Sequence, residues 1–338
     1  MVPKDKAPFF SIIISTRNRP DLFLTALRSV REQSFCDKEI IVVIDGSTSF
    51  HMARYQEFKH QFDDILFLEL PHRPIGHGQS YAMNYGVSKA SGQYLCFLDD
   101  DDHWTDSQYL ARLFDNLTAA KIPVDVHYSQ QKAVYSDGVW RKEHLWIEDL
   151  IPSVVVQKRH QGESYFVDAL FLLSSGGFAH LNCSAFRRGF YLAIGGMDET
   201  IRYENDRDIY IRSIDAAKTI LYSTSYVSVH SIPDAHKKSN LSTITSELEK
   251  KIYQMRVYDK GISFSKHIAV VRFCCKAKVY EMKHAARILA REKQYTAAAY
   301  YARAVLIDGF NLRWLTYTLY LIFRAMFRPN STSNKSSR

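Results

Sequence analysis

Four consecutive aspartates, Asp99, Asp100, Asp101 and Asp102, directly follow the apolar segment 94–98. Adjacent carboxylates raise one another's pKa values, so at neutral pH they favour a shared cation or hydrogen-bond donors. An apolar strand that brings these side chains to a sheet edge predicts a site for a metal ion and phosphate groups. The alternative is a set of capping acids at a helix starting near residue 106, a need that one or two aspartates would satisfy.

A further acid, Asp45, follows the apolar segment 39–44 within Asp-Gly-Ser, which is also an ordinary turn sequence. Ligands of open parallel sheets bind beyond the carboxyl ends of the strands. We therefore expect Asp45 and the four aspartates to line one crevice. Thr16 and Arg19, at the end of the first apolar segment, are candidates for lining the same crevice.

Short apolar segments alternate with helical patterns along the first hundred residues, which predicts a mostly parallel sheet covered by helices on both faces. A looser region follows, and helices are expected again near the C-terminus. The expected strands are 9–15, 39–44, 65–70, 94–98 and 220–229, and the expected helices are 79–90, 165–173, one starting near residue 205, 266–290 and 295–306.

With 338 residues, of which 46% are hydrophobic, the chain is long enough for one large α/β domain and a smaller appendage. Its net charge of +8 indicates attraction to acidic partners such as anionic lipid, sugar phosphates or nucleic acid. The five cysteines show no paired spacing for zinc and are expected to be buried thiols in a reducing compartment. We find neither a signal peptide nor an apolar segment long enough to span a membrane.

Five motifs, in this order and spacing, resemble those of the family 2 glycosyltransferases, which have the GT-A nucleotide-sugar-binding fold. The resemblance covers residues 9–236. The motifs are Ser-Ile-Ile-Ile-Ser-Thr-Arg-Asn-Arg-Pro (11–20), Glu-Ile-Ile-Val-Val-Ile-Asp-Gly-Ser (39–47), Ala-Met-Asn-Tyr-Gly (82–86), Gly-Gln-Tyr-Leu-Cys-Phe-Leu-Asp-Asp-Asp-Asp (92–102) and Gly-Gly-Met-Asp-Glu (195–199).

The resemblance implies that Asp99 and Asp101 are the two acids of an Asp-x-Asp motif. Asp101 would hold Mg²⁺ or Mn²⁺ against the donor diphosphate, with Asp99 as a further ligand. Asp99 and Asp100 would also reach the ribose or the sugar of the donor, which leaves Asp102 as a helix-capping acid. Carboxylates together with substrate phosphates are the usual ligands of these hard cations.

The family pattern also implies donor contacts outside the aspartate run. Asp45 matches the acid that accepts a hydrogen bond from the base, usually uracil, although the preceding acid of the family is Ile44 here. The loop 74–78 and Asn84 match the segment along the diphosphate, where Met83 replaces the basic residue of many members.

Transfer to a hydroxyl group requires a base that removes its proton. The family's Glu-Asp motif matches Asn205 and Asp206, so that Asp206 is the expected base and Asn205 replaces the first acid. Capping of the helix by Asn205 or Asp206 is the alternative. Asp208 competes as the base, but it lies four residues before Arg212, the spacing of an ion pair on a helix.

Histidines and tryptophans supply the remaining candidates. His230, at the end of a strand, matches the place of a third metal ligand in many metal-dependent GT-A enzymes, while His236 is a candidate for the diphosphate or the acceptor. Trp104, Trp140 and Trp146 could stack on an acceptor sugar, or could be core residues.

We divide the chain into a GT-A domain over 1–240, a helical region over 241–328 and a disordered basic tail over 329–338. The nucleotide-binding half of the domain is 1–105 and the acceptor half is 106–240. Aromatic and basic residues in 311–328 indicate either an interfacial helix that contacts a membrane or a helix that packs on its predecessors.

The predicted activity is transfer of a monosaccharide, with inversion, from a nucleotide-diphosphate sugar, with UDP as the nucleotide, to a glycan or lipid-linked acceptor in cell-surface polysaccharide synthesis. The expected location is the cytoplasm or the inner face of the membrane, and no nucleic-acid partner is expected. The alternatives are a non-catalytic nucleotide-sugar or glycan-binding scaffold and a metal-dependent phosphoesterase.

Overall fold

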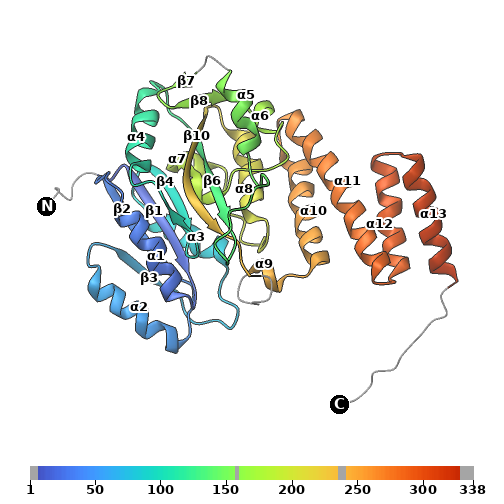
Figure 1. The fold of residues 1–338 in the computed structure, drawn as a ribbon, viewed down its shortest axis with the longest axis horizontal. Helices are drawn as coiled ribbons and strands as arrows, with labels where there is room; N and C mark the ends of the chain where they lie inside the picture. Colours follow the sequence, from blue (N-terminus) through green and yellow to red (C-terminus); the bar gives the residue numbers. More distant parts are fainter. Residues whose placement is uncertain (1–6, 157–159, 235–240, 328–338) are drawn as a thin grey trace.

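A ten-stranded sheet forms the centre of the computed structural model, which describes residues 7–156, 160–234 and 241–327 (Figure 1). The first part of the sheet is parallel, as the sequence predicts, whereas β5, β7, β8 and β9 pair antiparallel with their neighbours. Across the sheet the strands lie in the order β3 (Leu66–Glu69), β2 (Lys38–Ile44), β1 (Phe10–Thr16), β4 (Tyr94–Asp99), β9 (Ser184–Arg187), β6 (Val126–Val134), β10 (Ile220–Ser231), β8 (Ser164–Val167) and β7 (His160–Gln161), with β5 (His103–Trp104) paired to β10.

Alternate residues of the central strands point to opposite faces of the sheet, which gives two cores. On β1, Ile12 and Ile14 pack into one core and Ile13 into the other. The helices that cover the first face are α1 (Pro20–Arg31), α2 (Ser49–Gln61) and α4 (Tyr109–Ala119), and those that cover the second include α3 (Gln79–Lys89), α7 (Arg188–Ala193) and α8 (Asn205–Ala216). Because both faces are buried, the strands have continuous apolar sequences.

The chain reverses its direction of strand addition at β1, since β2 and β3 lie on one side of it and β4 on the other. Such a switch point leaves a crevice at the carboxyl ends of the strands, where no connection crosses. Thr16 ends β1 and Asp99 ends β4, and the two strands are neighbours. The fold therefore brings the first strand end and the aspartate run together.

The helix predicted over 165–173 is wrong. Tyr165 lies in β8 opposite Tyr222 of β10, and only the short helix α6 (Ala169–Leu172) follows. Asp168 starts this helix by accepting a hydrogen bond from the Phe171 N–H. Pairing with β10 outweighs the local helical spacing, because periodicity alone cannot separate a short apolar strand from a buried helix.

Besides α6, the chain between β6 and β9 forms further short helical segments. These are η1 (Glu148–Leu150), α5 (Ile151–Val155) and η2 (Leu181–Cys183). The loop that follows β6 leads into η1 and α5, and α5 is drawn in green in Figure 1.

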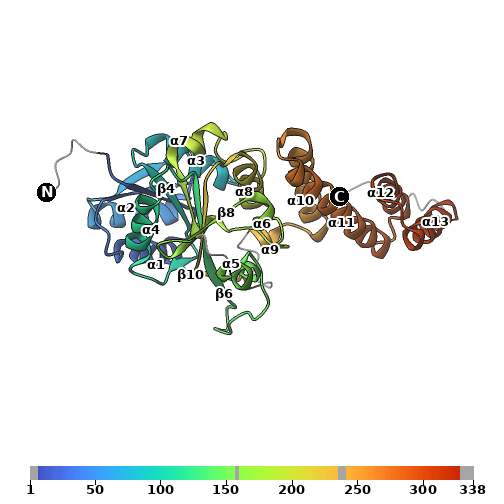
Figure 2. The same ribbon diagram turned by 90° about the horizontal axis from the view of Figure 1, so that it is seen from above.

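The C-terminal region is helical, and it extends away from the sheet (Figure 2). It consists of α9 (Leu241–Ile244), α10 (Glu247–Phe264), α11 (Ile268–Arg291), α12 (Tyr295–Asp308) and α13 (Leu312–Met326). The sequence analysis missed α10, which begins at a capping box formed by Ser246 and Glu249. Tyr258 of α10 and Cys274 of α11 belong to the same core as the sheet, whereas the alanines of α11 and α12 pack into a separate core with α13.

Of the five cysteines, Cys96, Cys183 and Cys274 are buried, but Cys36 and Cys275 are exposed, so the expectation of five buried thiols is wrong for two. In the part of the chain that the structure describes, no helix combines the length and the apolar composition needed to cross a bilayer.

Candidate functional site

Asp100 lies at the bottom of the crevice, where it is 1% exposed. It accepts a hydrogen bond from the Thr16 hydroxyl at 2.7 Å and from Arg19 Nε at 3.2 Å, and Arg19 also donates to Asp101 at 2.8 Å. Burial raises the pKa of Asp100 to about 6, although the Arg19 charge acts in the opposite direction. Thr16 is itself 2% exposed, so it holds Asp100 in place and does not line the crevice as predicted.

Asp99 and Asp101 keep 15% and 16% of their side-chain surface exposed, and both lie on the crevice side of the run. With Asp102 they offer carboxylate oxygens within 4.8 Å of one another. Burial, and then the neighbouring charge of Asp206, raise the pKa of Asp99 well above its usual range. Crowded carboxylates of this kind fit a hard divalent cation such as Mg²⁺ or Mn²⁺, which would relieve their repulsion.

Asp102 does not cap a helix, so the predicted role is wrong. The next helix, α4, begins at Tyr109 without a side-chain cap. Asp102 instead accepts hydrogen bonds from Asn182 Nδ2 at 2.5 Å, His230 Nδ1 at 2.8 Å and the Ser231 N–H at 2.7 Å. The buried acid therefore orients the end of β10 against the end of β4.

One ring nitrogen of His230, Nδ1, is hydrogen-bonded to the Asp102 carboxylate. Histidines that bind metal ions usually have such a hydrogen bond on the nitrogen that does not contact the metal. Burial acts to lower the pKa of His230, but the Asp102 carboxylate outweighs this effect and raises it. Because Nδ1 donates to Asp102, Nε2 keeps a lone pair that can bind a cation. His180, Asp102 and His230 form a second group of possible metal ligands, and the ring centroid of His180 is 5.4 Å from that of His230.

Asp206, at the start of α8, lies beside the aspartate run. One of its oxygens, Oδ2, is 3.3 Å from His180 Nε2, and the other, Oδ1, is buried without a hydrogen-bond partner among the described residues. Burial raises the pKa of Asp206 to about 7. A buried carboxylate with one oxygen unused and a pKa near 7 has the properties of a general base.

His180 lies against Asp206, with its Nε2 3.3 Å from Asp206 Oδ2. Its Nδ1 accepts from the Asn182 N–H at 3.3 Å, so the ring hydrogen lies on Nε2, which faces Asp206. Burial lowers the pKa of His180 to about 3, and the ring is therefore neutral at pH 7.

Gly177 allows the segment before His180 to lie against the loop of Trp146, since a Cβ at Gly177 would lie 1.8 Å from the Trp146 carbonyl oxygen.

Asn205 connects α8 to α3 and to the aspartate run. Its amide donates to Gln79 Oε1 at 3.1 Å, and Gln79 Nε2 donates to Asp99 at 2.5 Å. Neither Asn205 nor Asp206 caps α8. Asp208 points away from the crevice and pairs with Arg212 Nη2 at 2.6 Å, as its spacing predicts.

Asp45 lies at the end of β2 and holds the loop before α3. Its carboxylate accepts from the His77 N–H at 2.7 Å, from His77 Nδ1 at 2.9 Å and from the Gly78 N–H at 3.0 Å. Gly76 is required in this loop because its φ is +67° and a Cβ would lie 2.5 Å from Asp45 Oδ2. Asp45 thus fixes the loop before α3 against the end of β2.

Asn84 does not face the crevice, so its predicted contact with the donor is wrong. Its amide donates to the Met197 carbonyl at 2.8 Å and to Glu199 at 2.9 Å, and its oxygen accepts from the Met197 N–H and Tyr191 hydroxyl. All four hydrogen-bonding positions of the side chain are therefore used to fasten α3 to the loop after α7.

The tryptophans differ in exposure. Trp104 is 3% exposed and donates to the Asn182 carbonyl, which makes it a core residue and not an acceptor contact. Trp140 is 52% exposed, and Trp146 lies with its ring edge on His180 and His230. His236 lies outside the described residues.

Sequence reasoning missed His180, Asn182 and Gln79, which hold Asp206, Asp102 and Asp99. None of them belongs to a motif that the sequence analysis used, and a lone histidine or amide is usually structural. Only their contacts across the sheet identify them.

A protein-family model described as "Glycosyl transferase family 2" matches residues 11–192, more than half of the chain. A "PGL/p-HBAD biosynthesis glycosyltransferase" of Mycobacterium bovis is 36% identical over 207 residues, which are 61% of this chain and 70% of that protein. A "GalNAc(5)-diNAcBac-PP-undecaprenol beta-1,3-glucosyltransferase" of Campylobacter jejuni is 36% identical over 28% of this chain and 30% of its own length. The matched region spans only 35% of a glycosyl transferase from Escherichia coli K12 and 17% of the glycosyltransferase GlyA from Streptococcus pneumoniae.

Solved structures share the fold along nearly the whole chain. A crystal structure of S. aureus TarS 1–349 in complex with UDP-GlcNAc has a TM-score of 0.62 at 14% identity, covering 94% of this chain and 87% of that one. The mannosyltransferase PcManGT of Pyrobaculum calidifontis, in complex with GDP-Man and Mn²⁺, has a TM-score of 0.57 at 17% identity, covering 95% and 87%. The architecture is therefore that of the GT-A glycosyltransferases.

Proposed function

We propose, since this chain belongs to glycosyl transferase family 2, that it transfers a monosaccharide from a nucleotide-diphosphate sugar to a hydroxyl group of a glycan or lipid-linked acceptor, with inversion at the anomeric carbon. The observation that carries the proposal is the pairing of a buried base with an acidic cluster. Asp206 keeps Oδ1 without a partner among the described residues, next to Asp99 and Asp101. We propose cell-surface polysaccharide synthesis as the setting, which the names of several relatives support.

In the proposed reaction, the Asp206 carboxylate takes the proton of the acceptor hydroxyl as its oxygen attacks the anomeric carbon. The bond from that carbon to the donor diphosphate breaks on the opposite face, and a single displacement inverts the configuration. His180 Nε2 lies 3.3 Å from Asp206 Oδ2 and would hold the carboxylate in place. In this way the base is oriented before the substrate arrives.

Asp101 and Asp99 belong to a carboxylate cluster with Asp102, and Asp102 also belongs to a second cluster with His230 and His180. We propose that Asp101, Asp99 and His230 would hold Mn²⁺ or Mg²⁺, with Asp102 orienting His230. The cation, when bound, supplies positive charge for the departing diphosphate. Arg19 fixes Asp100 and Asp101 in the required conformation. We propose UDP as the nucleotide, a choice that the TarS complexes with UDP and UDP-GlcNAc support.

A non-catalytic nucleotide-sugar or glycan-binding scaffold is the alternative. A scaffold would have no need for a buried carboxylate whose pKa is raised to about 7 next to a cation site. A phosphoesterase is less well supported, because a metal site of the described candidates would leave the buried carboxylate of Asp206 without a role.

A thermal-shift screen tests the proposed donor. We expect UDP with Mn²⁺ to raise the melting temperature more than UDP or Mn²⁺ alone, because the diphosphate and Asp101 would share the cation. GDP with Mn²⁺ serves as the matched nucleotide. Stabilisation by GDP and not by UDP would contradict the choice of nucleotide, and no stabilisation by either would contradict the donor site.

We also propose that the end of the helical region contacts an anionic lipid surface. Exposed apolar side chains gather on and near α13, and between residues 266 and 327 the chain has eleven lysines and arginines but three acids. The exposed residues are Ile307, Phe310, Leu312, Leu319, Phe323, Met326 and Phe327. An apolar helix face with basic neighbours is typical of interfacial binding.

Vesicle sedimentation tests this contact. We expect the protein to bind vesicles that contain phosphatidylglycerol, and Phe323→Ser to weaken this binding because it removes an exposed apolar side chain. Equal binding to vesicles of phosphatidylcholine alone, or no binding to either, would contradict a contact with anionic lipid.

A further inference from the structure

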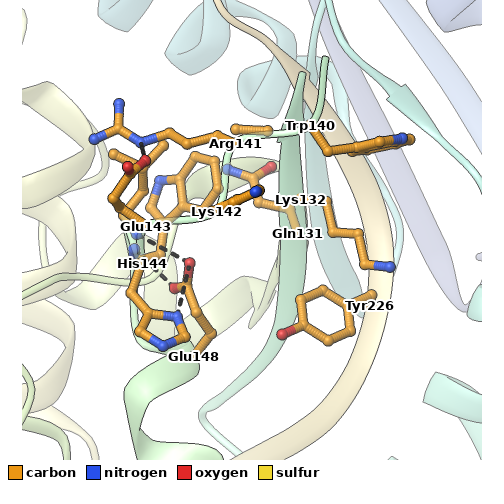
Figure 3. A pocket seen from close by; sticks show the side chains of 12 residues that line it. Gln131, Lys132, Trp140, Arg141, Lys142, Glu143, His144, Glu148 and Tyr226 are labelled. Atoms are coloured by element: carbon orange, nitrogen blue, oxygen red, sulfur yellow. Dashed lines mark hydrogen bonds and ion pairs between the residues drawn. The ribbon is translucent and has the colours of Figure 1, made fainter. Parts of the chain in front are cut away.

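A pocket of about 320 Å³ opens beside the candidate active site, between the ends of β6 and β10 and the loop that follows β6 (Figure 3). Trp140, Arg141 and Lys142 come from the loop, Lys132 comes from β6 and Tyr226 from β10. None of these residues has a part in the base or the cation site described above.

Gln131 supplies the strongest sign of a missing ligand. It lines the pocket and is 1% exposed, yet neither its amide nitrogen nor its amide oxygen has a hydrogen-bond partner among the described residues. Buried amides are almost always hydrogen-bonded, because an unpaired one costs about 1–3 kcal/mol. A ligand with hydroxyl groups could donate to the oxygen and accept from the nitrogen.

Two aromatic rings face the outer part of the pocket with a cation between them. The Lys132 ammonium lies 5.9 Å from the ring centroid of Trp140 and 5.1 Å from that of Tyr226. Trp140 is 52% exposed and Tyr226 is 39% exposed, so a ligand can reach both side chains. Their faces suit the apolar face of a sugar ring, as aromatic side chains combine apolar area with a polar rim.

The lysines and arginine that line the pocket, which are Lys132, Arg141 and Lys142, outnumber its two acids, Glu143 and Glu148. Lys132 and Lys142 have no ion pair with a carboxylate in the part of the chain that the structure describes. Of the two acids that line the pocket, Glu148 uses both oxygens to accept from the Leu145 and Trp146 N–H groups, and Glu143 lies 3.5 Å from Arg141. The pocket therefore retains positive charge for an anion.

Trp146 joins this pocket to the reaction site. It lines the pocket, and its ring centroid lies 5.9 Å from that of His180 and 5.6 Å from that of His230, each edge to face. His180 in turn contacts Asp206. A chain of sugars that occupies the pocket would therefore pass Trp146 on its way to the base.

We propose that this pocket binds an acidic sugar of the acceptor glycan, one that carries a carboxylate or a phosphate group. The sugar face stacks on Trp140 and Tyr226, Lys132 binds the anionic group and Gln131 binds hydroxyl groups. The inference rests on the proposed function, because it names the acceptor of that reaction.

Titrations followed by saturation-transfer NMR test the proposal without sugar transfer. The probes are methyl β-D-glucuronide and glucose 6-phosphate, with methyl β-D-glucoside as the neutral control. We expect at least one anionic probe to bind about tenfold more tightly than the neutral one, since one charge-assisted hydrogen bond is worth about 1.4 kcal/mol or more. Which of the two anionic probes binds decides between carboxylate and phosphate.

Lys132→Met should remove the preference for the anionic probe. Lys89→Met is the matched control, because Lys89 is also an exposed lysine whose ammonium lies over a tyrosine ring, 5.7 Å from the centroid of Tyr85. A second measurement needs no variant, since a rise in salt should weaken binding of the anionic probe and leave the neutral one unchanged.

Equal binding of the anionic and neutral probes, no binding of the anionic probes, or an unchanged preference in Lys132→Met would each overturn the proposal. UDP binding is measured in the same samples and should be the same in all variants. If the unmodified protein does not bind UDP, the proposed function is contradicted. Binding of the anionic probe would still test the proposed ligand of the pocket.

Discussion

Asp206→Asn is expected to lower sugar transfer about a thousandfold and to leave binding of the nucleotide and Mn²⁺ unchanged. Asparagine keeps the shape of the side chain but cannot take a proton, and general-base catalysis contributes about 10²- to 10⁴-fold to a rate. Single-turnover transfer and calorimetric titration with UDP would separate the two effects.

The pH dependence of transfer gives a second readout of the same residue. Burial raises the pKa of Asp206 to about 7, so the carboxylate holds a proton below that pH and can act as a base above it. Transfer should therefore increase as the pH rises through about 7 and then level off. The residual activity of Asp206→Asn should lack this step.

Asp208→Asn is the matched control, because Asp208 lies on the same helix and pairs with Arg212 and Lys260 outside the crevice. It should lower the melting temperature, since it leaves two cations without their buried partner, but should retain the pH profile of transfer. Unchanged turnover in Asp206→Asn, or loss of the pH step in Asp208→Asn alone, would contradict the assignment of the base.

Asp101→Asn is expected to abolish the dependence of nucleotide binding on Mn²⁺ and to lower transfer by about 10³-fold. The change removes the partly exposed carboxylate of Asp101, which lies in one cluster with Asp99 and Asp102. A catalytic metal ion supplies several kcal/mol of charge stabilisation in the transition state. Calorimetric titration of UDP, with and without Mn²⁺, measures the binding effect.

Asp106→Asn serves as the control for Asp101→Asn. Asp106 is also a partly exposed aspartate, but it pairs with Arg112 of α4 and lies outside the carboxylate cluster. Mn²⁺ should still strengthen UDP binding in this variant. Tight, Mn²⁺-dependent binding of UDP in Asp101→Asn would show that another residue holds the cation.

The sequence predicted the parallel half of the fold well because its signals are local. Buried parallel strands have continuous apolar sequences, and each turn that follows them has a recognisable composition, so β1, β2, β3 and β4 lie within a residue or two of their predicted bounds. The second half depends on pairing between distant residues. Tyr165 lies in a strand only because β10 is beside it.

The roles of the site residues also differ in whether the sequence could predict them. The positions of Asp101, Asp206 and His230 could be predicted from motifs, and the structure brings all three to one crevice. The roles of Asp102 and Asn84 could not, because each depends on partners more than one hundred residues away in the chain, His230 and Met197. Thr16 and Trp104 have suitable chemistry, but burial keeps them from a substrate.

The central claim is that the aspartate run, His230 and Asp206 form one site for a cation, a nucleotide sugar and an acceptor. The most direct measurement is anomalous X-ray scattering at the manganese edge from crystals grown with UDP and Mn²⁺. The account predicts one strong peak in contact with Asp101 and the UDP diphosphate, on the same side of the crevice as Asp206 Oδ1. A peak away from Asp101, or UDP bound in the crevice without manganese, would contradict it.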